Sequence, residues 1–585
     1  MDSVEDIENA LEIDIASSDN LTVEDCRRLT GPGILWDHPG AVLQLSFDTF
    51  TRKQIIDVWH QYARQVLDAV GWSDETFTER AFEGGINLAI SAPMDQLYSA
   101  VFVLQTTWHF CAADLLSASS GDFDAMIRDL RSVMQREANP ALVSLLREGT
   151  ANGLDVLCDD DEVSVGHGTG SRAWPVADIP DIHDLDWSVL HNVPVALITG
   201  TNGKTTTTRL CAAIARAAGK TSGLTSTDFV QVGGEVLDRG DYSGPGGARL
   251  LLRDRRLEVA CLEVARGGIL RRGLPTRQAD VAIVTNVAAD HLGQYGVNTV
   301  PELARAKFSV HRALKSKGVL VLNADDEFVV AEAARTDANI WWFSLDPESP
   351  RIIAAKDANL PCGWLNDHQI NFFDGKQTTS VIDVRDIPIT MAGAARYNIL
   401  NALGATCVSR ALGLDFASVR AGLAGFKNDT SDNPGRLNAF HVNEARLFVD
   451  FAHNPHSVAA VADTVAALPA KRRFVLLSHA GDRSDDDIRD VTLTALKMQP
   501  DIVVAAELPD YLRGRETGEV SDLIVDTCYS KGLTPERVIR AASPLDGVTK
   551  VLDELQPEDV ALLLVLSDRD QVFDLLARRS EQKVR

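Results

Sequence analysis

The chain has 585 residues, of which 45% are hydrophobic and 24% are charged, and its formal net charge at pH 7 is −26. This length exceeds what a single hydrophobic core supports, so two to four domains are expected. The acidic balance argues against a nucleic acid or an anionic membrane as the main partner, because both attract a basic surface, and it requires any anion site to be locally basic.

The eight cysteines are scattered singly along the chain, and no CxxC pair is present. This pattern suggests neither a zinc ribbon nor a disulfide framework, and it fits a reducing cytoplasm. The N-terminus, Met1-Asp-Ser-Val-Glu-Asp6, is acidic and lacks an apolar core, so no signal peptide is predicted. No apolar run reaches membrane-spanning length, so a membrane partner is not expected.

Residues 1–187 are predicted to form a first domain that is mostly helical or of the α+β class. The apolar pattern predicts helices over residues 51–70 and 94–116. Ile86–Ile90 is interpreted as part of an apolar helical face in the core, and the Pro- and Asp-rich stretch 173–185 as a linker. Two roles stay open for this domain, namely binding an acceptor and forming a homo-oligomer.

Residues 188–427 are predicted to form a central α/β domain. Short β-branched runs alternate with helical patterns there, which is typical of βαβ units and a mainly parallel sheet. The predicted strands are 195–199, 257–263, 281–286 and 319–323. Residues 340–390 are interpreted as a small antiparallel insertion, and residues 392–412 as the helix that closes the domain.

A glycine loop, Gly200-Thr-Asn-Gly-Lys-Thr-Thr206, follows the first of these strands. Gly200 and Gly203 allow the backbone to turn sharply and to present its N–H groups to an anion. Lys204 supplies a charge for terminal phosphates, and the Thr205 hydroxyl is placed to bind Mg²⁺. The loop has two residues between its glycines instead of the four of a usual P-loop. It predicts an ATP site at Gly200, Thr201, Asn202, Gly203, Lys204, Thr205 and Thr206, the alternative being a plain strand–helix turn.

Polar residues stand at the ends of the next predicted strands, where open α/β sheets bind ligands. Glu263 ends one strand, and Asn286, Asp290 and His291 follow another. A carboxylate, an imidazole and the Thr205 hydroxyl near phosphates suit Mg²⁺. The alternatives are a helix-capping role for Glu263 and an ordinary loop histidine.

Lys307 lies in a predicted helix, 301–315, just after this group. A lysine near two metals could be carbamylated to an anionic ligand, and the alternative is a solvated helix lysine. Asn323 and Asp325, at another strand end, and Asn398 are candidates for contacts with the base or ribose. An Asx turn is the alternative for Asn323 and Asp325.

Residues 428–585 are predicted to form a smaller, Rossmann-like α/β domain. Its predicted strands are 447–451, 474–478, 502–505 and 561–566.

Arg436 stands on an Asn-Pro-Gly-Arg turn and suits the γ-phosphate, because its donors form a rigid fork. Asp450 could accept from ribose hydroxyls, and His453 could line the cleft. Farther on, clustered arginines suggest a carboxylate or phosphate site, with a surface ion-pair network as the alternative.

These motifs, in this order, resemble the Mur ligase family. The shared features are the TGTNGKTT loop, Glu263, Asn286, Asp290-His291, Ala306-Lys307, Asn323-Ala-Asp325, Pro434-Gly-Arg436 and Asp450–Pro455. Residues 193–585 are most similar to the ligase portion of cyanophycin synthetases, through Asp241–Pro245, Leu262–Arg271, Asp290–Gly293, Pro434–Asn438, Gly481–Arg483 and Leu512–Glu519. The resemblance implies a P-loop, Mur-ligase-type fold for the central domain.

The chain also departs from that pattern. A cyanophycin synthetase carries an ATP-grasp domain between its N-terminal domain and its Mur-like half, and this chain has no room for one. Phe451 replaces a tyrosine of the family, and Ala506–Asp510 replaces an acidic segment. The resemblance therefore implies one ligation step, with the added amino acid left open.

The resemblance implies that a substrate carboxylate attacks the γ-phosphate of ATP, giving an acyl phosphate and ADP, and that an amine then displaces phosphate. The implied catalytic residues are Lys204, Glu263, His291, Lys307 and Arg436. The implied Mg²⁺ ligands are Thr205, Glu263, His291 and Lys307. Outside the loop, nucleotide contacts are expected from Asn323, Asn398, Arg436 and Asp450. Substrate contacts are expected from Arg266, Arg271, His453, Asn454, Arg513 and Arg515.

The expected partners are a small-molecule amino acid and an acidic acceptor. Other Mur-type activities, such as a folylpolyglutamate-synthase-like ligase, use the same chemistry on other substrates. A catalytically silent nucleotide-binding accessory protein and a simple P-loop NTPase are the remaining alternatives. The residues expected at the site favour an active ligase over both.

Overall fold

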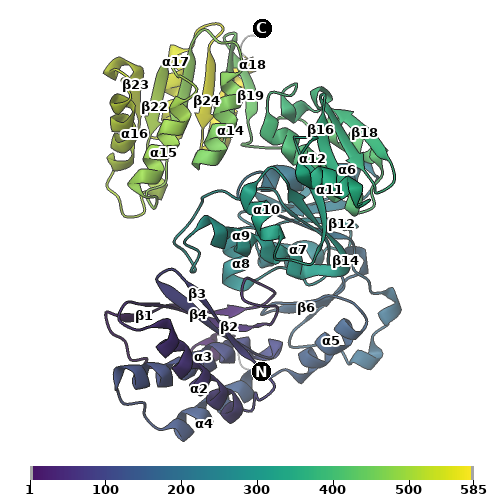
Figure 1. The fold of residues 1–585 in the computed structure, drawn as a ribbon, viewed down its shortest axis with the longest axis vertical. Helices are drawn as coiled ribbons and strands as arrows, with labels where there is room; N and C mark the ends of the chain where they lie inside the picture. Colours follow the sequence, from purple (N-terminus) through teal and green to yellow (C-terminus); the bar gives the residue numbers. More distant parts are fainter. Residues whose placement is uncertain (1–3, 582–585) are drawn as a thin grey trace.

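The structure is a computed structural model that describes residues 4–581, so residues 1–3 of the N-terminal segment considered above lie outside the described residues. Figure 1 shows three parts stacked along the long axis, from the purple N-terminal part through the teal centre to the yellow C-terminal part. Within the described residues, no helix combines the length and the apolar character needed to cross a bilayer.

The N-terminal part is built on a four-stranded antiparallel sheet in the order β1-β2-β4-β3. Its strands are β1 (Leu21–Leu29), β2 (Gly40–Phe47), β3 (Phe77–Phe82) and β4 (Gly85–Ser91). The helices α2 (Arg52–Val70) and α3 (Leu97–Leu116) pack on it, and α4 (Phe123–Glu137) packs on these two helices. Both predicted helices are confirmed, and Thr51 caps α2 through a capping box. This part is therefore α+β.

The helical interpretation of Ile86–Ile90 is wrong, because these residues lie within β4. Every residue of β4 is buried, so the strand reads as a continuous apolar run without the alternation of a half-exposed strand. A short apolar run does not distinguish a strand from a helix by its period. Its assignment to the core is confirmed.

A small subdomain joins this part to the centre. It contains α5 (Pro140–Ala151) and an antiparallel sheet of β5 (Val156–Cys158), β6 (Glu162–Val165) and β7 (Arg172–Pro175). The linker predicted over 173–185 is wrong in its first residues, which form β7. The rest is not a free linker either, because Ile182 and Leu185 pack against the buried apolar cluster of this subdomain. Apolar side chains between the prolines and aspartates hold it in place.

The central part carries an eleven-stranded sheet in the order β11-β10-β9-β12-β8-β13-β14-β15-β16-β17-β18. Its strands are β8 (Val195–Thr199), β9 (Ser222–Thr225), β10 (Phe229–Val232), β11 (Glu235–Arg239), β12 (Val259–Glu263), β13 (Ala279–Val284), β14 (Leu314–Asn323), β15 (Asn339–Ser344), β16 (Cys362–Asn366), β17 (Gln369–Phe373) and β18 (Thr378–Asp383). The seven strands from β9 to β16 in this order are parallel. The four strands predicted here are confirmed to within a few residues.

The interpretation of residues 340–390 as a separate antiparallel insertion is wrong. Strands β15 and β16 continue the parallel sheet, because α11 (Pro350–Asp357) provides the crossover between them. Only β17 and β18 are antiparallel, and they extend the same sheet at its edge. The apolar runs there resemble isolated hairpin strands in sequence, whereas each of β15 and β16 pairs in parallel with the strand that precedes it in the chain.

Helices cover both faces of this sheet. One face packs against α6 (Lys204–Ala217), α12 (Arg396–Ala411) and α13 (Phe416–Gly425). The other packs against α7 (Pro245–Leu252), α8 (Arg266–Arg272), α9 (Val300–Phe308) and α10 (Glu327–Ala333). Helix α9 is shorter than predicted, because a 3₁₀ turn follows it and β14 begins at Leu314.

The C-terminal part has a six-stranded sheet in the order β19-β20-β24-β21-β22-β23. Its strands are β19 (Asn438–Val442), β20 (Ala445–Asp450), β21 (Arg473–Leu477), β22 (Ile502–Ala506), β23 (Val538–Ala541) and β24 (Val560–Leu564). The helices α14 (Pro455–Ala466), α15 (Asp485–Leu496) and α16 (Glu519–Ser530) cover one face, and α17 (Pro544–Glu554) and α18 (Arg569–Glu581) cover the other. Four strands were predicted, and β19 and β23 were not. We keep 1–187, 188–427 and 428–585 as proposed domain boundaries.

Candidate active site

A cavity of about 310 Å³ lies where the central sheet meets the C-terminal sheet. Its walls come from the loop after β8, from the ends of β12 and β14, and from the start of α14. Several predicted residues line it together: Thr201, Asn202, Gly203, Lys204, Thr205, Thr206, Glu263, Asn323, Arg436, Asp450 and His453. The ends of parallel strands thus form one wall of a cleft, as expected for an α/β sheet.

The glycine loop requires both of its glycines. Gly200 and Gly203 have φ values of +148° and +82°, and a Cβ atom at Gly200 would lie 1.9 Å from the Thr285 hydroxyl. At Gly203 the Cβ would lie 2.3 Å from Oδ1 of Asn401. Asn286 fixes the loop, since its Oδ1 accepts from the N–H of Asn202 at 2.9 Å. The loop is therefore a rigid turn that opens α6 at Lys204.

Glu263 fits a metal-binding role. Its side chain is 2% exposed, and both carboxylate oxygens are buried without a hydrogen-bond partner among the described residues. Burial raises its pKa, while the charge of Lys204, the nearby Thr205 hydroxyl and the charges of Arg436 and Arg209 act in the opposite direction. Buried carboxylates normally accept hydrogen bonds or bind a cation, so the lack of a hydrogen-bond donor at Glu263 suits a bound metal ion. Together with the Thr205 hydroxyl, it offers the oxygen ligands that Mg²⁺ prefers.

Arg436 brings a charge to this site from the C-terminal part. Its Nη2 is 3.4 Å from the Thr205 hydroxyl, and its guanidinium lies 5.4 Å from the centre of the Phe451 ring. Asp450 lies behind it at the end of β20, where burial raises the pKa of its carboxyl to about 6 against the effect of Arg436. Arg436 therefore brings a positive charge from the C-terminal part to the Thr205 end of the glycine loop.

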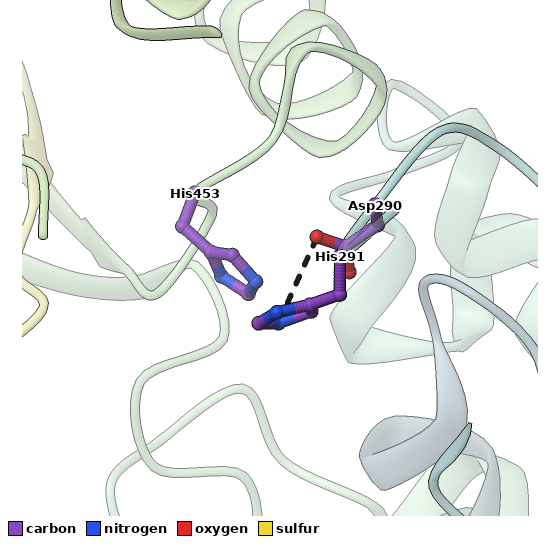
Figure 2. Close-up of side chains that lie close together, drawn as sticks. All are labelled: Asp290, His291 and His453. Atoms are coloured by element: carbon purple, nitrogen blue, oxygen red, sulfur yellow. Dashed lines mark ion pairs between the residues drawn. The ribbon is translucent and has the colours of Figure 1, made fainter. Parts of the chain in front are cut away.

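His291 lies outside this cavity, in a cluster with Asp290 and His453 (Figure 2). The ligand atoms of the three side chains lie within 4.8 Å of one another. The imidazole of His291 accepts a hydrogen bond from Nη2 of Arg483 at 3.0 Å. Burial lowers the pKa of His291 to about 4. The charge of Asp290 acts in the opposite direction, and the charge of Arg483 adds to the decrease. A neutral imidazole suits a metal, and in this structure its hydrogen bond is made to Arg483 of the C-terminal part.

Lys307 is not a solvated helix lysine, since its side chain is 3% exposed. Its Nζ donates a hydrogen bond to the carbonyl oxygen of Gly200 at 2.7 Å, directly beneath the glycine loop. Burial and the nearby charge of Lys204 lower its pKa well below the usual value. This environment disfavours an ammonium ion, so it is compatible with a neutral amine or with a carbamate.

Two asparagines differ from their expected roles. Asn398 is buried and donates to the carbonyl of Ile389, so it does not line the cavity. Its neighbour Tyr397 lines it instead. Asn454 caps α14 and donates to Oδ1 of Asn202 at 3.2 Å. Asn454 thus links the C-terminal part to the glycine loop.

The four arginines expected to bind substrate are not brought together. Arg266 donates to the side chain of Gln294 at 2.6 Å. Arg513 pairs with Asp482, and Arg515 pairs with residues of its own domain. Arg271 lines a different cavity. The C-terminal pairs match the surface ion-pair alternative, because carboxylates of the same domain pair with both arginines.

Sequence reasoning missed a buried ion-pair cluster between the two parts. Asp228 accepts from Arg209 on α6 at 2.6 Å and from Arg569 on α18 at 2.7 Å. Arg209 is 2% exposed and Asp228 is 9% exposed. Arg209 also donates to Asn433, just before the turn that carries Arg436. No local motif signals this cluster, since its members come from segments far apart in the chain.

Comparisons with known families identify the two parts that form the cavity. The Mur ligase middle domain family matches residues 198–409, and the Mur ligase, glutamate ligase domain family matches residues 435–564. Across these residues the chain belongs to the Mur ligase family. The glycine loop, Glu263 and Lys307 lie in the Mur ligase middle domain, and Arg436 and Asp450 lie in the Mur ligase C-terminal domain.

Individual relatives agree with the resemblance found from the motifs. A cyanophycin synthetase of Synechocystis sp. is 38% identical over 378 residues, which cover 64% of this chain and 42% of the relative. One of Crocosphaera subtropica is 40% identical over 339 residues, covering 58% and 38%. A UDP-N-acetylmuramoyl-L-alanyl-D-glutamate–2,6-diaminopimelate ligase of Bacillus velezensis is 25% identical over 325 residues, covering 53% and 62%. The chain thus spans about two fifths of the length of the cyanophycin synthetases that it matches.

A solved structure of E. coli FolC in complex with DHPP and ADP is also similar to the chain. It is 21% identical, with a TM-score of 0.49, and the match covers 66% of this chain and 89% of that one.

Proposed function

We propose that this protein is an ATP-dependent ligase that joins the carboxylate of an acidic amino acid or peptide to an amine through an acyl phosphate. The observation that carries the proposal is the buried carboxylate of Glu263, whose oxygens have no hydrogen-bond partner among the described residues, beside the Thr205 hydroxyl in a cavity that Lys204 and Arg436 also line. This arrangement concentrates positive charge around one group of oxygen ligands in a chain whose net charge is −26.

In the proposed reaction, an acceptor carboxylate oxygen attacks the γ-phosphorus of ATP, and the bond to the β-phosphate oxygen breaks to release ADP. The amine then attacks the acyl carbon, inorganic phosphate leaves, and the amine loses one proton. Lys204 and Arg436 neutralise the charge on the transferring phosphoryl group. Mg²⁺, held by Thr205 and Glu263, with Lys307 and His291 as further candidate ligands, would supply additional charge neutralisation.

An acyl phosphate must be protected from water, and the contacts between the two Mur ligase domains support this requirement. Asn454 reaches the glycine loop, and Arg483 reaches His291. We infer that these contacts belong to the closed, reactive form.

The compartment that we propose is the cytoplasm, because all eight cysteines are free of disulfide bonds.

The ion pair between Arg569 and Asp228 offers a test of domain closure. Replacing Arg569 with glutamine removes the contact across the domains, while Asp228 keeps its pair with Arg209. We expect kcat to fall about ten-fold or more with little change in Tm, because closure is weakened and the fold is not. The matched control is Arg578→Gln on the same helix, where the side chain is mostly exposed. An unchanged kcat for Arg569→Gln would show that the pair is not part of closure.

Asp450 gives the nucleotide site a pH dependence. Because its pKa is raised to about 6, the carboxylate is ionised above that pH and becomes neutral below it. An ionised carboxylate accepts stronger hydrogen bonds from ribose hydroxyls, so ATP affinity should weaken up to about ten-fold between pH 7 and pH 5. Nucleotide titrations over this range test the expectation. The Asp450→Asn variant should lose most of this change in affinity, and a variant that keeps the full change with a midpoint near pH 6 would assign the effect to another group.

The proposed function as a whole is tested by phosphate release from ATP and Mg²⁺ against a matrix of amines and acidic acceptors. The acceptors include free aspartate, aspartyl peptides and β-aspartyl-arginine. A ligase releases phosphate only when one carboxylate and one amine are present, and the product is heavier by the mass of the condensation. A folylpolyglutamate-synthase-like ligase would respond to a different acceptor. Binding of ATP without any release would favour a catalytically silent accessory protein.

A further inference from the structure

The arginines of the segment Leu512–Glu519 have no role in the reaction as described above. Neither Arg513 nor Arg515 lines the cavity beside the glycine loop. The side chain of Arg515 is nevertheless only 15% exposed, although it carries a charge and lies in a loop. A charged side chain that is buried to this extent is held by specific partners.

Arg515 contacts four acceptors at once. Its Nε donates to the carbonyl oxygen of Gly481 at 2.9 Å, and its Nη2 donates to that of Arg483 at 2.7 Å. Its Nη2 also lies 2.9 Å from Oδ1 of Asp485, and its Nη1 lies 2.6 Å from Oε1 of Glu519. Because one rigid, planar group contacts two carbonyl oxygens of the same turn, it fixes the backbone of residues 481–484, which we call the Arg483 loop.

The backbone of the neighbouring segment packs directly against this loop. The N–H of Gly481 donates to the carbonyl oxygen of Tyr511 at 2.9 Å. A Cβ atom at Gly481 would lie 2.0 Å from the carbonyl oxygen of Leu512, so the two backbones approach as closely as glycine allows. Arg513 pairs with Asp482 of the loop. The Arg483 loop is therefore held through its backbone and through two arginines.

Arg483 extends from this loop to the Mur ligase middle domain. Its Nη2 is 3.0 Å from Nε2 of His291 and 3.6 Å from Oδ1 of Asp290. A guanidinium can only donate, so the His291 nitrogen that faces it carries a lone pair. These contacts join two domains, and they require that the Arg483 loop places the guanidinium at this position.

We propose that Arg515 is a positioning residue for domain closure, which holds the Arg483 loop in the form that lets Arg483 contact Asp290 and His291. This inference rests on the proposed ligase function, and it gives Arg515 a role other than binding substrate. Without the contact, water would reach the acyl phosphate and hydrolyse part of it to the free carboxylate and inorganic phosphate, with release of a proton. Phosphate would then be released without product.

Hydrogen exchange followed by mass spectrometry tests the positioning without any substrate. The variant Arg515→Lys keeps the charge but lacks the planar fork. We expect the peptides that cover residues 478–487 and 288–297 to exchange at least three-fold faster in this variant than in the wild type. The second peptide lies in the other domain, and its exchange should rise to the same extent in Arg483→Met. Unchanged exchange of residues 288–297 in Arg515→Lys would overturn the inference, because Arg515 would then stabilise only its own domain.

The matched control is Arg489→Lys, the same substitution at an arginine of α15. Arg489 pairs with Asp485, which Arg515 also contacts, and with Asp486. Within residues 4–581 its hydrogen bonds go to these two carboxylates and to no carbonyl oxygen of the Arg483 loop. Its exchange pattern at residues 288–297 should match the wild type. Equal effects of Arg489→Lys and Arg515→Lys would assign the change to the ion pairs of Asp485 and overturn the inference.

Turnover tests the consequence for the reaction. The ratio of product to released phosphate should be near one in the wild type and should fall at least two-fold in Arg515→Lys and in Arg483→Met. The KM for ATP should stay within two-fold, because neither residue lines the nucleotide cavity. The double variant should have the same ratio as Arg483→Met, since both substitutions remove the same contact. Additive losses in the double variant would contradict a role that acts through Arg483.

The two measurements separate this inference from the proposed function. Faster exchange of residues 288–297 in Arg515→Lys, in a wild type that forms no product with any acceptor, would contradict the ligase function and leave the positioning role standing. Ligation with the same ratio of product to phosphate in wild type and Arg515→Lys would leave the function standing and overturn the positioning role.

Discussion

Replacing Lys204 with alanine is expected to lower ATP-dependent product formation by roughly a thousand-fold. Lys204 opens α6 and lines the nucleotide cavity, where its charge meets the terminal phosphates in the proposed reaction. Its Nζ donates to the carbonyl oxygen of Thr201 at 2.8 Å, so the side chain already lies folded over the loop. A positive charge that is already held in place stabilises the transition state most where it faces the phosphoryl group that is being transferred. Steady-state phosphate release with saturating ATP measures the effect.

The matched control for Lys204 is Lys220→Ala. Lys220 is half-exposed and pairs with Glu258, away from the nucleotide cavity. Its removal should leave kcat within about two-fold, as is usual for an exposed ion pair. If Lys204→Ala kept more than a tenth of the wild-type rate, the glycine loop would not be the site of phosphoryl transfer.

Replacing Lys307 with methionine is expected to lower kcat about a hundred-fold while Tm stays nearly the same. Methionine keeps the apolar stem and most of the volume, but it can form neither the hydrogen bond to Gly200 nor a carbamate. The lowered pKa of Lys307 favours the neutral amine, which is the form that reacts with CO₂. Initial rates and thermal unfolding of the variant test both parts of the expectation.

The chemical state of Lys307 has its own measurement. Protein equilibrated with ¹³C-bicarbonate should show a carbamate carbon signal in the wild type that is absent from Lys307→Met. Lys315→Met serves as the control, since Lys315 is half-buried and pairs with Asp280. A normal kcat in Lys307→Met would remove Lys307 from the catalytic residues. A low kcat without a carbamate signal would limit its role to holding the glycine loop.

The sequence predicted those parts of the site whose residues are neighbours in the chain. The glycine loop needs two positive φ angles and a following helix, and both requirements are visible in seven consecutive residues. Glu263 could be assigned because a buried apolar strand ends in a carboxylate, which has few structural explanations. In each case the strand, its end and the polar group are neighbours in the chain.

The contacts between domains could not be predicted in the same way. Asp228 and Arg569 are 341 residues apart, and their ion pair exists only because the C-terminal part packs on the central part. The orientation of His291 toward Arg483 depends on the same packing. Arginine clusters in the C-terminal part looked like a substrate site, but neighbouring carboxylates neutralise Arg513 and Arg515. The sequence shows which charges exist, whereas their partners depend on the tertiary fold.

The errors in the fold prediction have a related origin. Ile86–Ile90 was assigned to a helix because a five-residue apolar run has no resolvable period. The sequence prediction separated residues 340–390 from the sheet. In the structure β15 pairs in parallel with β14, and α10 forms the connection between these two strands. Local propensity identified strands there, whereas the parallel pairing of β15 with β14 and of β16 with β15 decided their sheet.

The central claim is that a carboxylate is activated by phosphorylation, and oxygen transfer tests it most directly. An acceptor labelled with ¹⁸O in its reacting carboxylate would be incubated with ATP, Mg²⁺ and the amine, and the released phosphate would be analysed by mass spectrometry. The proposed reaction predicts one ¹⁸O atom in each phosphate, because the attacking carboxylate oxygen leaves with it. Phosphate that carries no label, and takes its new oxygen from water, would contradict the account and indicate simple ATP hydrolysis.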